Sequence, residues 1–365
     1  MNSTINFSRG VPDPASFPRE ELDEMTRIAL RDHAGTILQY GPAYGYGPLR
    51  EFLANRFRST TANVLIGNGS LEIFNFLCEA LLGPGDTVFV ESPTYDRALT
   101  TLRQRGANIV GIDMGPDGVD IAQLEAALRR HVPKFFYVIP DFQNPTGASM
   151  SLESRKALVR LAQTYDFLIV EDGPYGFLRY FGPDIASIYS LAPERTLHLS
   201  SFTKLISPGV RTGFLLGDSQ LVHKVAQVAE RYYITPGYFA QGVVAEWCNQ
   251  GFLDTQLARL RALYAPRLTC AVDAVERHLP GRLFVRPEGG FFLGLKLDSA
   301  LAETTLIGAA AERGLILSSG DGFFPHRPAY RFLRLPFCAL APDDIRVGIA
   351  RLAEVLGELE KAVEA

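Results

Sequence analysis

Short apolar runs alternate along the middle of this chain with longer stretches of helical spacing. The apolar runs are residues 87–90, 109–112, 135–139, 167–170, 196–199 and 213–216. Helical spacing is found in residues 71–82, 120–130 and 152–165. Continuously apolar strands that alternate with helices are typical of a mostly parallel sheet with helices on both faces. The sequence therefore predicts an α/β fold.

The C-terminal third has a different pattern. A helical pattern covers residues 253–278, and Pro266 lies inside it, so we expect a kink or a break there. A mixture of strand and helix signals follows, and an amphipathic helix is expected over residues 343–363. A length of 365 residues is enough for roughly two domains.

Composition excludes several functional classes. Charged residues make up 21% of the chain, the net charge is −4 and both signs are dispersed, which argues against nucleic acid or an anionic membrane as the main partner. No apolar run approaches the ~18 residues of a membrane span, and no signal-like N-terminal run is present. The four cysteines form no Cys-x-x-Cys pair. We therefore expect reduced cysteines, no metal site and a cytoplasmic protein.

Polar motifs follow three of the expected strands. Asn144 follows residues 135–139, Asp172 follows residues 167–170, and the segment Ser200-Ser201-Phe202-Thr203-Lys204 follows residues 196–199. In an open α/β sheet, ligands bind beyond the carboxyl ends of the strands. These motifs are therefore expected to meet at one ligand site.

The residue types at these positions are those that a pyridoxal phosphate enzyme needs. The amine of Lys204 can form a Schiff base, and the carboxylate of Asp172 can keep the ring nitrogen protonated, so that the ring withdraws electrons. A phenol and an amide can bind the ring hydroxyl, while hydroxyls and a guanidinium can bind the phosphate. Taken singly, Lys204 could be a solvated lysine and Asp172 a helix cap.

Together, Lys204, Asp172, Asn144 and Arg211 resemble the class I/II aminotransferases of the aspartate aminotransferase fold type, fold type I. The similarity extends from Phe7 to Cys338 and looks closest to the 2-aminoadipate aminotransferase-like branch, whose Phe-Gln-Asn-Pro-Thr-Gly stands here at 142–147. The resemblance implies a large domain, residues 40–275, with a mostly parallel seven-stranded sheet between helices. Residues 1–39 and 276–365 would form a smaller α+β domain.

The resemblance also assigns the cofactor contacts. Asp172 would bind the ring nitrogen, Asn144 and Tyr175 the ring hydroxyl, and Tyr95 would stack on the ring, unless it packs under a loop instead. Gly67-Asn68-Gly69-Ser70 precedes a helix, so bare N–H groups there could bind the phosphate, or Ser70 could merely cap the helix. The implied phosphate site consists of Gly69, Ser70, Leu71, Ser201, Thr203 and Arg211. His198, inside a strand, is expected to pack rather than act.

Substrate contacts follow from the same resemblance. Arg334, in Arg-Leu-Pro-Phe, would bind the α-carboxylate with a planar fork, and Arg331 is the nearest competitor. The segment around Gly10 would lie over the substrate. Relatives usually have Gly-Gly-Leu-Pro there, whereas this chain has Arg9-Gly10-Val11-Pro12, so Arg9 would reach either the substrate or solvent. Gly173 also departs from the usual Asp, with no consequence that we can derive.

The implied activity is transfer of an amino group between an L-amino acid and a 2-oxo acid, by ping-pong kinetics, in a homodimer. Tyr40 would cross to the neighbouring subunit's phosphate, or else pack within its own subunit. The same residues could serve a lyase, cyclase or oxidase of amino acids, because the fold does not decide the reaction. A non-catalytic ligand-binding module is a third reading, which the presence of Lys204 opposes. The sequence does not identify the amino acid.

Overall fold

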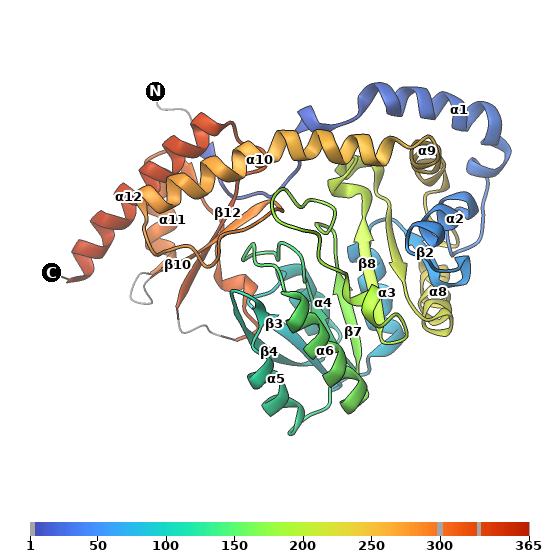
Figure 1. Cartoon of the computed structure of the whole chain (residues 1–365), viewed down its shortest axis with the longest axis horizontal. Helices are drawn as coiled ribbons and strands as arrows, with labels where there is room; N and C mark the ends of the chain where they lie inside the picture. The colour runs from blue at the N-terminus through green and yellow to red at the C-terminus, as the bar shows by residue number, and fades with distance from the viewer. Residues whose placement is uncertain (1–3, 298–301, 327–329, 365) are drawn as a thin grey trace.

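The centre of the molecule is an eight-stranded sheet of order β2-β9-β8-β7-β6-β3-β4-β5 (Figure 1). The computed structural model describes residues 4–297, 302–326 and 330–364. Strands β8, β7, β6, β3 and β4 are parallel, whereas β9 runs antiparallel to both β8 and β2. The strands are β2 (Val64–Gly67), β3 (Thr87–Ser92), β4 (Asn108–Gly115), β5 (Gly118–Val119), β6 (Phe135–Val138), β7 (Leu168–Asp172), β8 (Thr196–Ser201) and β9 (Gly213–Leu216).

The expected α/β fold with a mostly parallel sheet is confirmed. All of the apolar runs named above form strands, and β2 completes the seven that the resemblance implies. The eighth strand, β5, has two residues and pairs antiparallel with β4. A strand of two residues is too short to produce an apolar run in the sequence.

The middle of the sheet is buried on both faces, because successive side chains of a strand point into different cores. In β6, Phe135 and Tyr137 pack into one core, and Phe136 and Val138 pack into the other. The first core is closed by α3 (Ser70–Leu81), α4 (Asp96–Gln104) and α8 (Ser219–Tyr233). The second is closed by α5 (Ile121–Leu128), α6 (Leu152–Tyr165) and α7 (Ile188–Leu191).

A long helix, α10 (Phe252–His278), runs across the molecule from α9 (Tyr238–Asn249) towards the C-terminal part (Figure 1). Pro266 lies inside α10, and the helix continues through it. Of the two expectations for Pro266, a kink or a break, the break is therefore wrong. No described helix is both long enough and apolar enough to cross a membrane.

The C-terminal part is a smaller α+β assembly. β10 (Phe292–Leu297) pairs antiparallel with β12 (Arg331–Pro336), and α11 (Glu303–Glu312) and α12 (Pro342–Glu364) pack beside them. The N-terminal β1 (Ile5–Asn6) joins this part by pairing with β11 (Leu315–Ile316).

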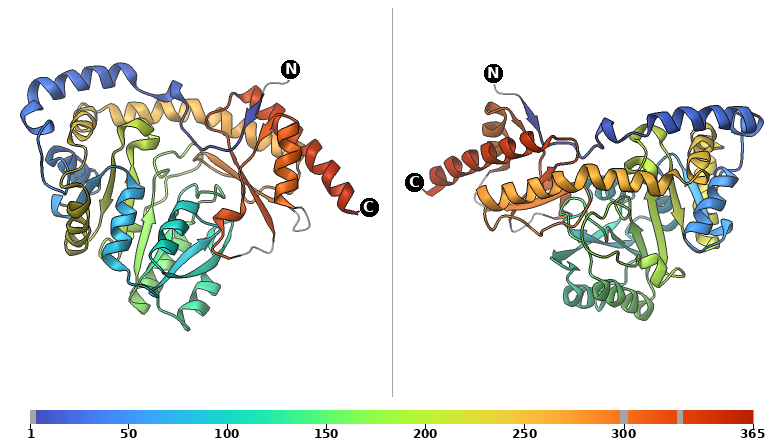
Figure 2. Two further views of the ribbon diagram at one scale, coloured as in Figure 1. Left: turned by 180° about the vertical axis from the view of Figure 1, so that it is seen from behind. Right: turned by 45° about the horizontal axis from the view of Figure 1, so that its top comes forward.

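From β1 the chain crosses the molecule to α1 (Arg19–Ile37), which packs against α9 at the opposite end (Figure 2). The division at residues 39 and 275 stays a prediction. The remaining helices are α2 (Gly47–Arg56) and the short 3₁₀ turns η1 (Pro14–Ser16), η2 (Thr61–Asn63), η3 (Phe202–Lys204), η4 (Pro208–Val210) and η5 (Asp321–Phe323).

Candidate active site

A cavity of about 490 Å³ lies beyond the carboxyl ends of β6, β7 and β8, where the sequence places its polar motifs. Among the expected site residues, Tyr40 alone does not line it. The other expected residues on its wall are Arg9, Gly10, Gly69, Ser70, Leu71, Tyr95, Asn144, Asp172, Tyr175, Ser201, Thr203, Lys204, Arg211 and Arg334.

Asp172 is the last residue of β7 and is 8% exposed. Its Oδ2 accepts a hydrogen bond of 2.6 Å from the phenol of Tyr137. Its Oδ1 is buried and has no hydrogen-bond partner among the described residues. Burial raises the pKa of Asp172 to about 6, and the Tyr137 bond and nearby His198 oppose that rise. One carboxylate oxygen is thus left for a cationic ligand group.

Lys204 ends the 3₁₀ turn η3, directly after β8. Its Nζ lies 3.4 Å from the backbone oxygen of Gly10. Burial lowers the pKa of this amine, and the neighbouring Arg334 and Arg211 lower it further. A lowered pKa favours the neutral amine, which is the nucleophilic form.

The N-terminus of α3 forms an anion site. Gly69, at φ +112°, precedes the helix, and no described side chain caps its first turn. The N–H groups of Ser70 and Leu71 are therefore available to an anion, and the helix dipole favours negative charge there. A Cβ on Gly69 would lie 2.5 Å from Nη2 of Arg211, so the guanidinium approaches this turn closely.

Hydroxyl groups complete this anion site. Ser201 Oγ accepts a hydrogen bond of 3.0 Å from the backbone N–H of Thr203, and the two hydroxyls lie 2.7 Å apart. Arg211 is itself fixed, since its Nη2 donates to the backbone oxygen of Asn68 at 2.7 Å. The site therefore offers backbone N–H groups, hydroxyls and one guanidinium, a donor set that suits a phosphate.

Arg334, on β12, brings a second guanidinium to the cavity. Its Nη1 donates to Oδ1 of Asn144 at 2.9 Å, and its Nη2 donates to the backbone oxygen of Ser8 at 3.3 Å. Its Cζ lies 4.8 Å from the ring centroids of both Phe292 and Phe323. Its Nε is buried without a partner among the described residues. These contacts hold the guanidinium in place and leave its Nε able to donate to a ligand.

The competing residue Arg331 lies elsewhere. It forms an ion pair with Asp321, with 3.2 Å between nitrogen and oxygen, and does not line the cavity. Since successive residues of a strand alternate between faces, Arg331 and Arg334, three apart, point to opposite faces of β12. The geometry therefore favours Arg334 as the substrate arginine.

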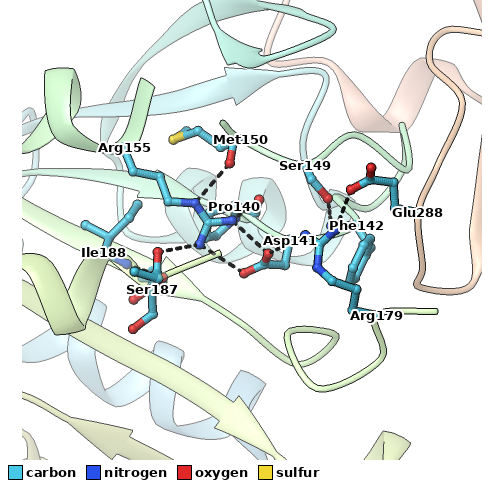
Figure 3. Close-up of polar contacts among 12 residues, drawn as sticks. Pro140, Asp141, Phe142, Ser149, Met150, Arg155, Arg179, Ser187, Ile188 and Glu288 are labelled. Atoms are coloured by element: carbon cyan, nitrogen blue, oxygen red, sulfur yellow. Dashed lines mark hydrogen bonds and ion pairs between the residues drawn. The ribbon is translucent and has the colours of Figure 1, made fainter. Parts of the chain in front are cut away.

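The loop that carries Asn144 is clamped at both ends by a buried arginine (Figure 3). Arg155, on α6, is fully buried, and its Nη2 and Nε donate to the backbone oxygens of Pro140 and Met150, each at 3.0 Å. It also forms a two-bond ion pair with Asp141, at 2.7 and 3.2 Å. Residues 140–150 are thus tied into a closed loop by a single side chain.

Two further contacts hold the tip of this loop. The guanidinium of Arg179 lies 4.8 Å from the ring centroid of Phe142, whose φ is +49°, and it also pairs with Glu288 (Figure 3). Inside the loop, Gln143 Nε2 donates to Glu91 at 2.9 Å, while its Oε1 accepts from the backbone N–H of Thr146 at 3.0 Å. The position of Asn144 is therefore set by buried contacts.

Two tyrosines complete the wall. Tyr95 precedes α4 at the end of β3, and burial raises its pKa to about 12. Tyr175 is 5% exposed and packs edge-on against Phe291 and Phe292, with centroid distances of 5.7 and 5.6 Å. Burial also raises the pKa of Tyr175 well above its usual range. Both phenols therefore stay protonated at neutral pH and can donate hydrogen bonds.

Comparison with known proteins agrees with this chemistry. A model of the family described as aminotransferase class I and II matches residues 3–352. The chain belongs to this family. It is 32% identical over 370 residues to aromatic-amino-acid aminotransferase 1 of Thermococcus litoralis, covering 98% of this chain and 89% of the relative. It is 31% identical over 357 residues to 2-aminoadipate transaminase of Thermus thermophilus, covering 96% and 90%.

Solved structures agree as well. The α-aminoadipate aminotransferase of Thermus thermophilus, in complex with N-(5'-phosphopyridoxyl)-L-leucine, superposes with a TM-score of 0.93 at 31% identity, covering 98% of this chain and 93% of that one. The kynurenine aminotransferase of Pyrococcus horikoshii gives 0.94 at 31% identity, covering 98% and 92%. The protein is a pyridoxal phosphate-dependent aminotransferase of fold type I. The family, fold and cofactor expected from the sequence are confirmed.

The cavity of this aminotransferase fits the cofactor. The unpaired Oδ1 of Asp172 is a partner for a protonated ring nitrogen, and the open N-terminus of α3 is a partner for a phosphate. The unpaired Nε of Arg334 remains for a carboxylate. Among the described residues, no group of three or more His, Cys, Asp or Glu side chains could hold a metal ion.

The sequence did not reveal several residues that shape the site. Tyr137, Arg155, Arg179 and Gln143 hold Asp172 and the loop of Asn144, yet none stood out as functional. Only Tyr137 carried a usable signal, because a tyrosine near the carboxyl end of a buried strand needs a hydrogen-bond partner for its hydroxyl. The expected packing role of His198 is confirmed, since it is buried and its Nδ1 lies 2.9 Å from Glu171.

Proposed function

We propose that this aminotransferase moves the amino group of an L-amino acid to a 2-oxo acid, with Lys204, Asp172 and Arg334 as the central residues. The observation that carries the proposal is their convergence. A partly buried amine, a carboxylate oxygen without a partner and a guanidinium nitrogen without a partner among the described residues line one cavity. Each supplies a different requirement of the reaction, so their meeting favours catalysis over a purely structural role.

The cofactor contacts are assigned as follows. Ser70, Leu71, Ser201, Thr203 and Arg211 would bind the phosphate. Asn144 and Tyr175 would bind the ring hydroxyl, Asp172 the ring nitrogen, and Tyr95 would cover one face of the ring. When bound, pyridoxal phosphate supplies a carbonyl that condenses with amines and a ring that accepts electrons from the substrate α-carbon.

The protein's own residues orient the substrate, move the proton and exclude water. Arg334 orients the substrate by binding its α-carboxylate, with Asn144 holding the guanidinium at 2.9 Å. The Nζ of Lys204, whose lowered pKa favours the neutral amine, would accept the proton from the substrate α-carbon and return it to the carbon derived from the cofactor's carbonyl. The backbone of Ser8, Gly10 and Val11 covers this region, through contacts with Arg334, Lys204 and Cys338. Covering the site excludes water.

We propose 2-aminoadipate or a similar acid with two carboxylates as the preferred amino donor. Arg9 and Arg97 line the cavity and add positive charge beyond Arg334. A 2-aminoadipate transaminase is among the relatives. Aromatic amino acids are the second candidate, because Tyr95 and Phe292 also line the cavity and an aromatic-amino-acid aminotransferase is equally similar.

The test is a panel of amino donors assayed with one 2-oxo acid acceptor. We expect kcat/KM for 2-aminoadipate to exceed that for norleucine, which has a side chain of similar length without the second carboxylate. The preference should shrink in Arg9→Ala and Arg97→Ala, while alanine should be used equally by all three proteins. An unchanged preference in both variants would show that neither arginine binds the second carboxylate.

We also propose a homodimer in the cytoplasm. Large apolar and aromatic side chains are exposed near one end of the molecule, where Gly41 N–H donates to Thr235 Oγ1 at 3.2 Å. The exposed fractions are 66% for Leu38, 74% for Tyr40, 61% for Tyr232, 64% for Ile234 and 42% for Phe239. Such a surface suits a partner subunit. In such a dimer Tyr40 would belong to the partner's phosphate site.

The proposed location rests on the cysteines: all four are free, which suits a reducing compartment such as the cytoplasm.

A further inference from the structure

We propose that Tyr137 is a positioning residue that donates to one oxygen of Asp172, and so keeps the carboxylate ionised and its other oxygen free for the cofactor's ring nitrogen. The inference deepens the proposed function, because it rests on the role given to Asp172 there. Tyr137 acts through Asp172.

The geometry begins in the sheet. Tyr137 on β6 is paired in register with Val170 on β7, two residues before Asp172, so all three residues lie on the same face. Tyr137 is 1% exposed, and its ring packs against Phe74 with 5.0 Å between centroids. Its hydroxyl is therefore fixed by packing when it donates to Asp172 Oδ2 at 2.6 Å.

The two oxygens of Asp172 are thus given different tasks. Oδ2 is satisfied by Tyr137, whereas Oδ1 is buried with no partner in the described part of the chain. The two oxygens of a carboxylate are chemically equivalent, so the orientation of the carboxylate plane decides where the free oxygen lies. The phenol fixes that plane, because rotation out of it would break a hydrogen bond to a charged group in a buried site, and such bonds are strong.

The same bond affects protonation. Burial raises the pKa of Asp172, and the bond from Tyr137 and the nearby His198 on β8 lower it. Other titratable groups nearby are Glu91 on β3, Tyr95 after β3 and Tyr175 after β7. Burial raises the pKa of Tyr137 well above its usual range, so the phenol stays a donor. Without the phenol, the proton on Asp172 would be held more tightly.

Tyr137→Phe removes only the hydroxyl. The dissociation constants of pyridoxal phosphate and of its 1-deaza analogue, with carbon in place of the ring nitrogen, would be measured by absorbance between pH 6 and 8. We expect Tyr137→Phe to weaken pyridoxal phosphate binding by at least about tenfold, more at pH 6 than at pH 8, because a bond to a charged group is lost. Binding of the deaza analogue, which has no nitrogen for Asp172 to bind, should hardly change.

The matched control is Tyr180→Phe. Tyr180 is also buried, and its hydroxyl donates to the backbone oxygen of Gly290 at 2.9 Å, away from Asp172. This variant should leave the preference for pyridoxal phosphate over the analogue unchanged. If Tyr137→Phe weakens both ligands equally, or neither, the hydroxyl does not act through Asp172 and the inference is overturned.

The Asp172→Asn variant distinguishes a failure of this inference from a failure of the role proposed for Asp172. If Asp172→Asn keeps the preference for pyridoxal phosphate, the role given to Asp172 is wrong. If Asp172→Asn loses it and Tyr137→Phe keeps it, only the role of Tyr137 is wrong. Should Tyr137→Phe not fold, 3-fluorotyrosine incorporated at Tyr137 serves instead. Its more acidic phenol should strengthen the preference, and a weaker or unchanged preference would contradict the inference.

Discussion

Asp172 and Lys204 carry opposite charges when ionised and line the same cavity, and burial shifts their pKa values in opposite directions. The pKa of Asp172 is raised to about 6, while the pKa of Lys204 is lowered. In both cases burial disfavours the charged form. Asp172 nevertheless remains mostly ionised at neutral pH, and Lys204 shifts towards the neutral amine that the proposed chemistry uses. Burial thus shifts both pKa values towards neutral pH, the carboxyl of Asp172 from below and the amine of Lys204 from above.

Lys204→Ala should reduce turnover by at least about a thousandfold, because the nucleophile and proton carrier are lost together. Pyridoxal phosphate should still bind, since the anion site and Asp172 remain. In the unaltered enzyme, borohydride reduction should fix cofactor mass on the peptide that contains Lys204, as mass spectrometry would show. Lys134, on the surface near Asp86, is the control. Labelling of Lys134 in place of Lys204 would contradict the central assignment.

The raised pKa of Asp172 also predicts a dependence of stability on pH. Without cofactor, the folded protein holds this proton up to about pH 6, whereas the unfolded chain releases it near pH 4. The free energy of unfolding contributed by Asp172 is therefore highest below pH 4 and falls as pH rises to about 6, by roughly 3 kcal/mol.

Asp172→Asn removes this titration and leaves an oxygen that can accept from Tyr137. Urea unfolding of both cofactor-free proteins should show the variant gaining stability relative to the wild type as pH rises from about 4 to 6, with little change above. A difference that is flat across this range would mean that Asp172 has an ordinary pKa in the folded protein.

At the scale of elements, the sequence predicts the sheet well, because strands buried on both faces have a direct signature in continuous apolar runs. The break at Pro266 was the error. Leu260, Tyr264, Leu268 and Ala271 are buried on both sides of Pro266, which is itself exposed. Packing of this continuous face outweighs the ~3 kcal/mol cost of proline, and solvent can reach the carbonyl left without a partner.

The sequence named residues that the structure brings to one cavity most directly where the expected chemistry depends on residue type. Lys204, Asp172 and Arg334 are recognisable because few other side chains could replace them. Arg155 was not, because its partners include the backbone oxygens of Pro140 and Met150. Every residue has such an oxygen, so no sequence pattern marks the contact. It forms only when the fold brings α6 beneath the loop.

Arg155→Lys tests the clamp on this loop. Lysine keeps the charge and loses the planar fork that binds Asp141 and two carbonyls at once. Urea unfolding should show a loss of about 3 kcal/mol, since weakening a buried ion pair leaves charge without a full partner. KM for the amino donor should also rise, because Asn144 and hence Arg334 lose their fixed positions.

The control for this prediction is Arg160→Lys, on the exposed face of the same helix. It makes the same chemical change where no buried contact is lost, so stability and KM should both stay near their original values. Equal effects of the two substitutions would show that Arg155 does not hold the loop.

At the scale of the molecule, the N-terminal segment connects parts that the sequence separates. It begins beside β11 and contacts Arg334 and Lys204 through the backbone of Ser8 and Gly10. Asp13 then pairs with Arg267 on α10 at 2.6 Å, before the chain continues to α1 and the exposed Tyr40. The cover of the cavity and the Leu38 and Tyr40 part of the proposed interface therefore follow one another along one N-terminal segment, whose course from β1 to α1 is visible in Figure 2.

A shared active site follows if Tyr40 reaches the partner's phosphate. Tyr40→Ala and Lys204→Ala subunits would each be inactive as homodimers. In a hybrid dimer, one site would receive Lys204 from the first subunit and Tyr40 from the second, and the other site would receive neither. After complete exchange of an equal mixture, about a quarter of the wild-type activity should return, because about half of the dimers are hybrids and each has one complete site.

This test requires that Tyr40→Ala alone lowers activity substantially and that hybrids form, which differently tagged subunits and native mass spectrometry would show. Tyr232→Ala, exposed in the same region, is the control. In a mixture with Lys204→Ala, the activity should not exceed that of the Tyr232→Ala subunits alone, because these subunits keep Lys204 and hybrids create no additional complete site. If verified hybrids of Tyr40→Ala and Lys204→Ala gain nothing over their parents, each subunit completes its own phosphate site. Tyr40 would then contribute only to contacts between the subunits.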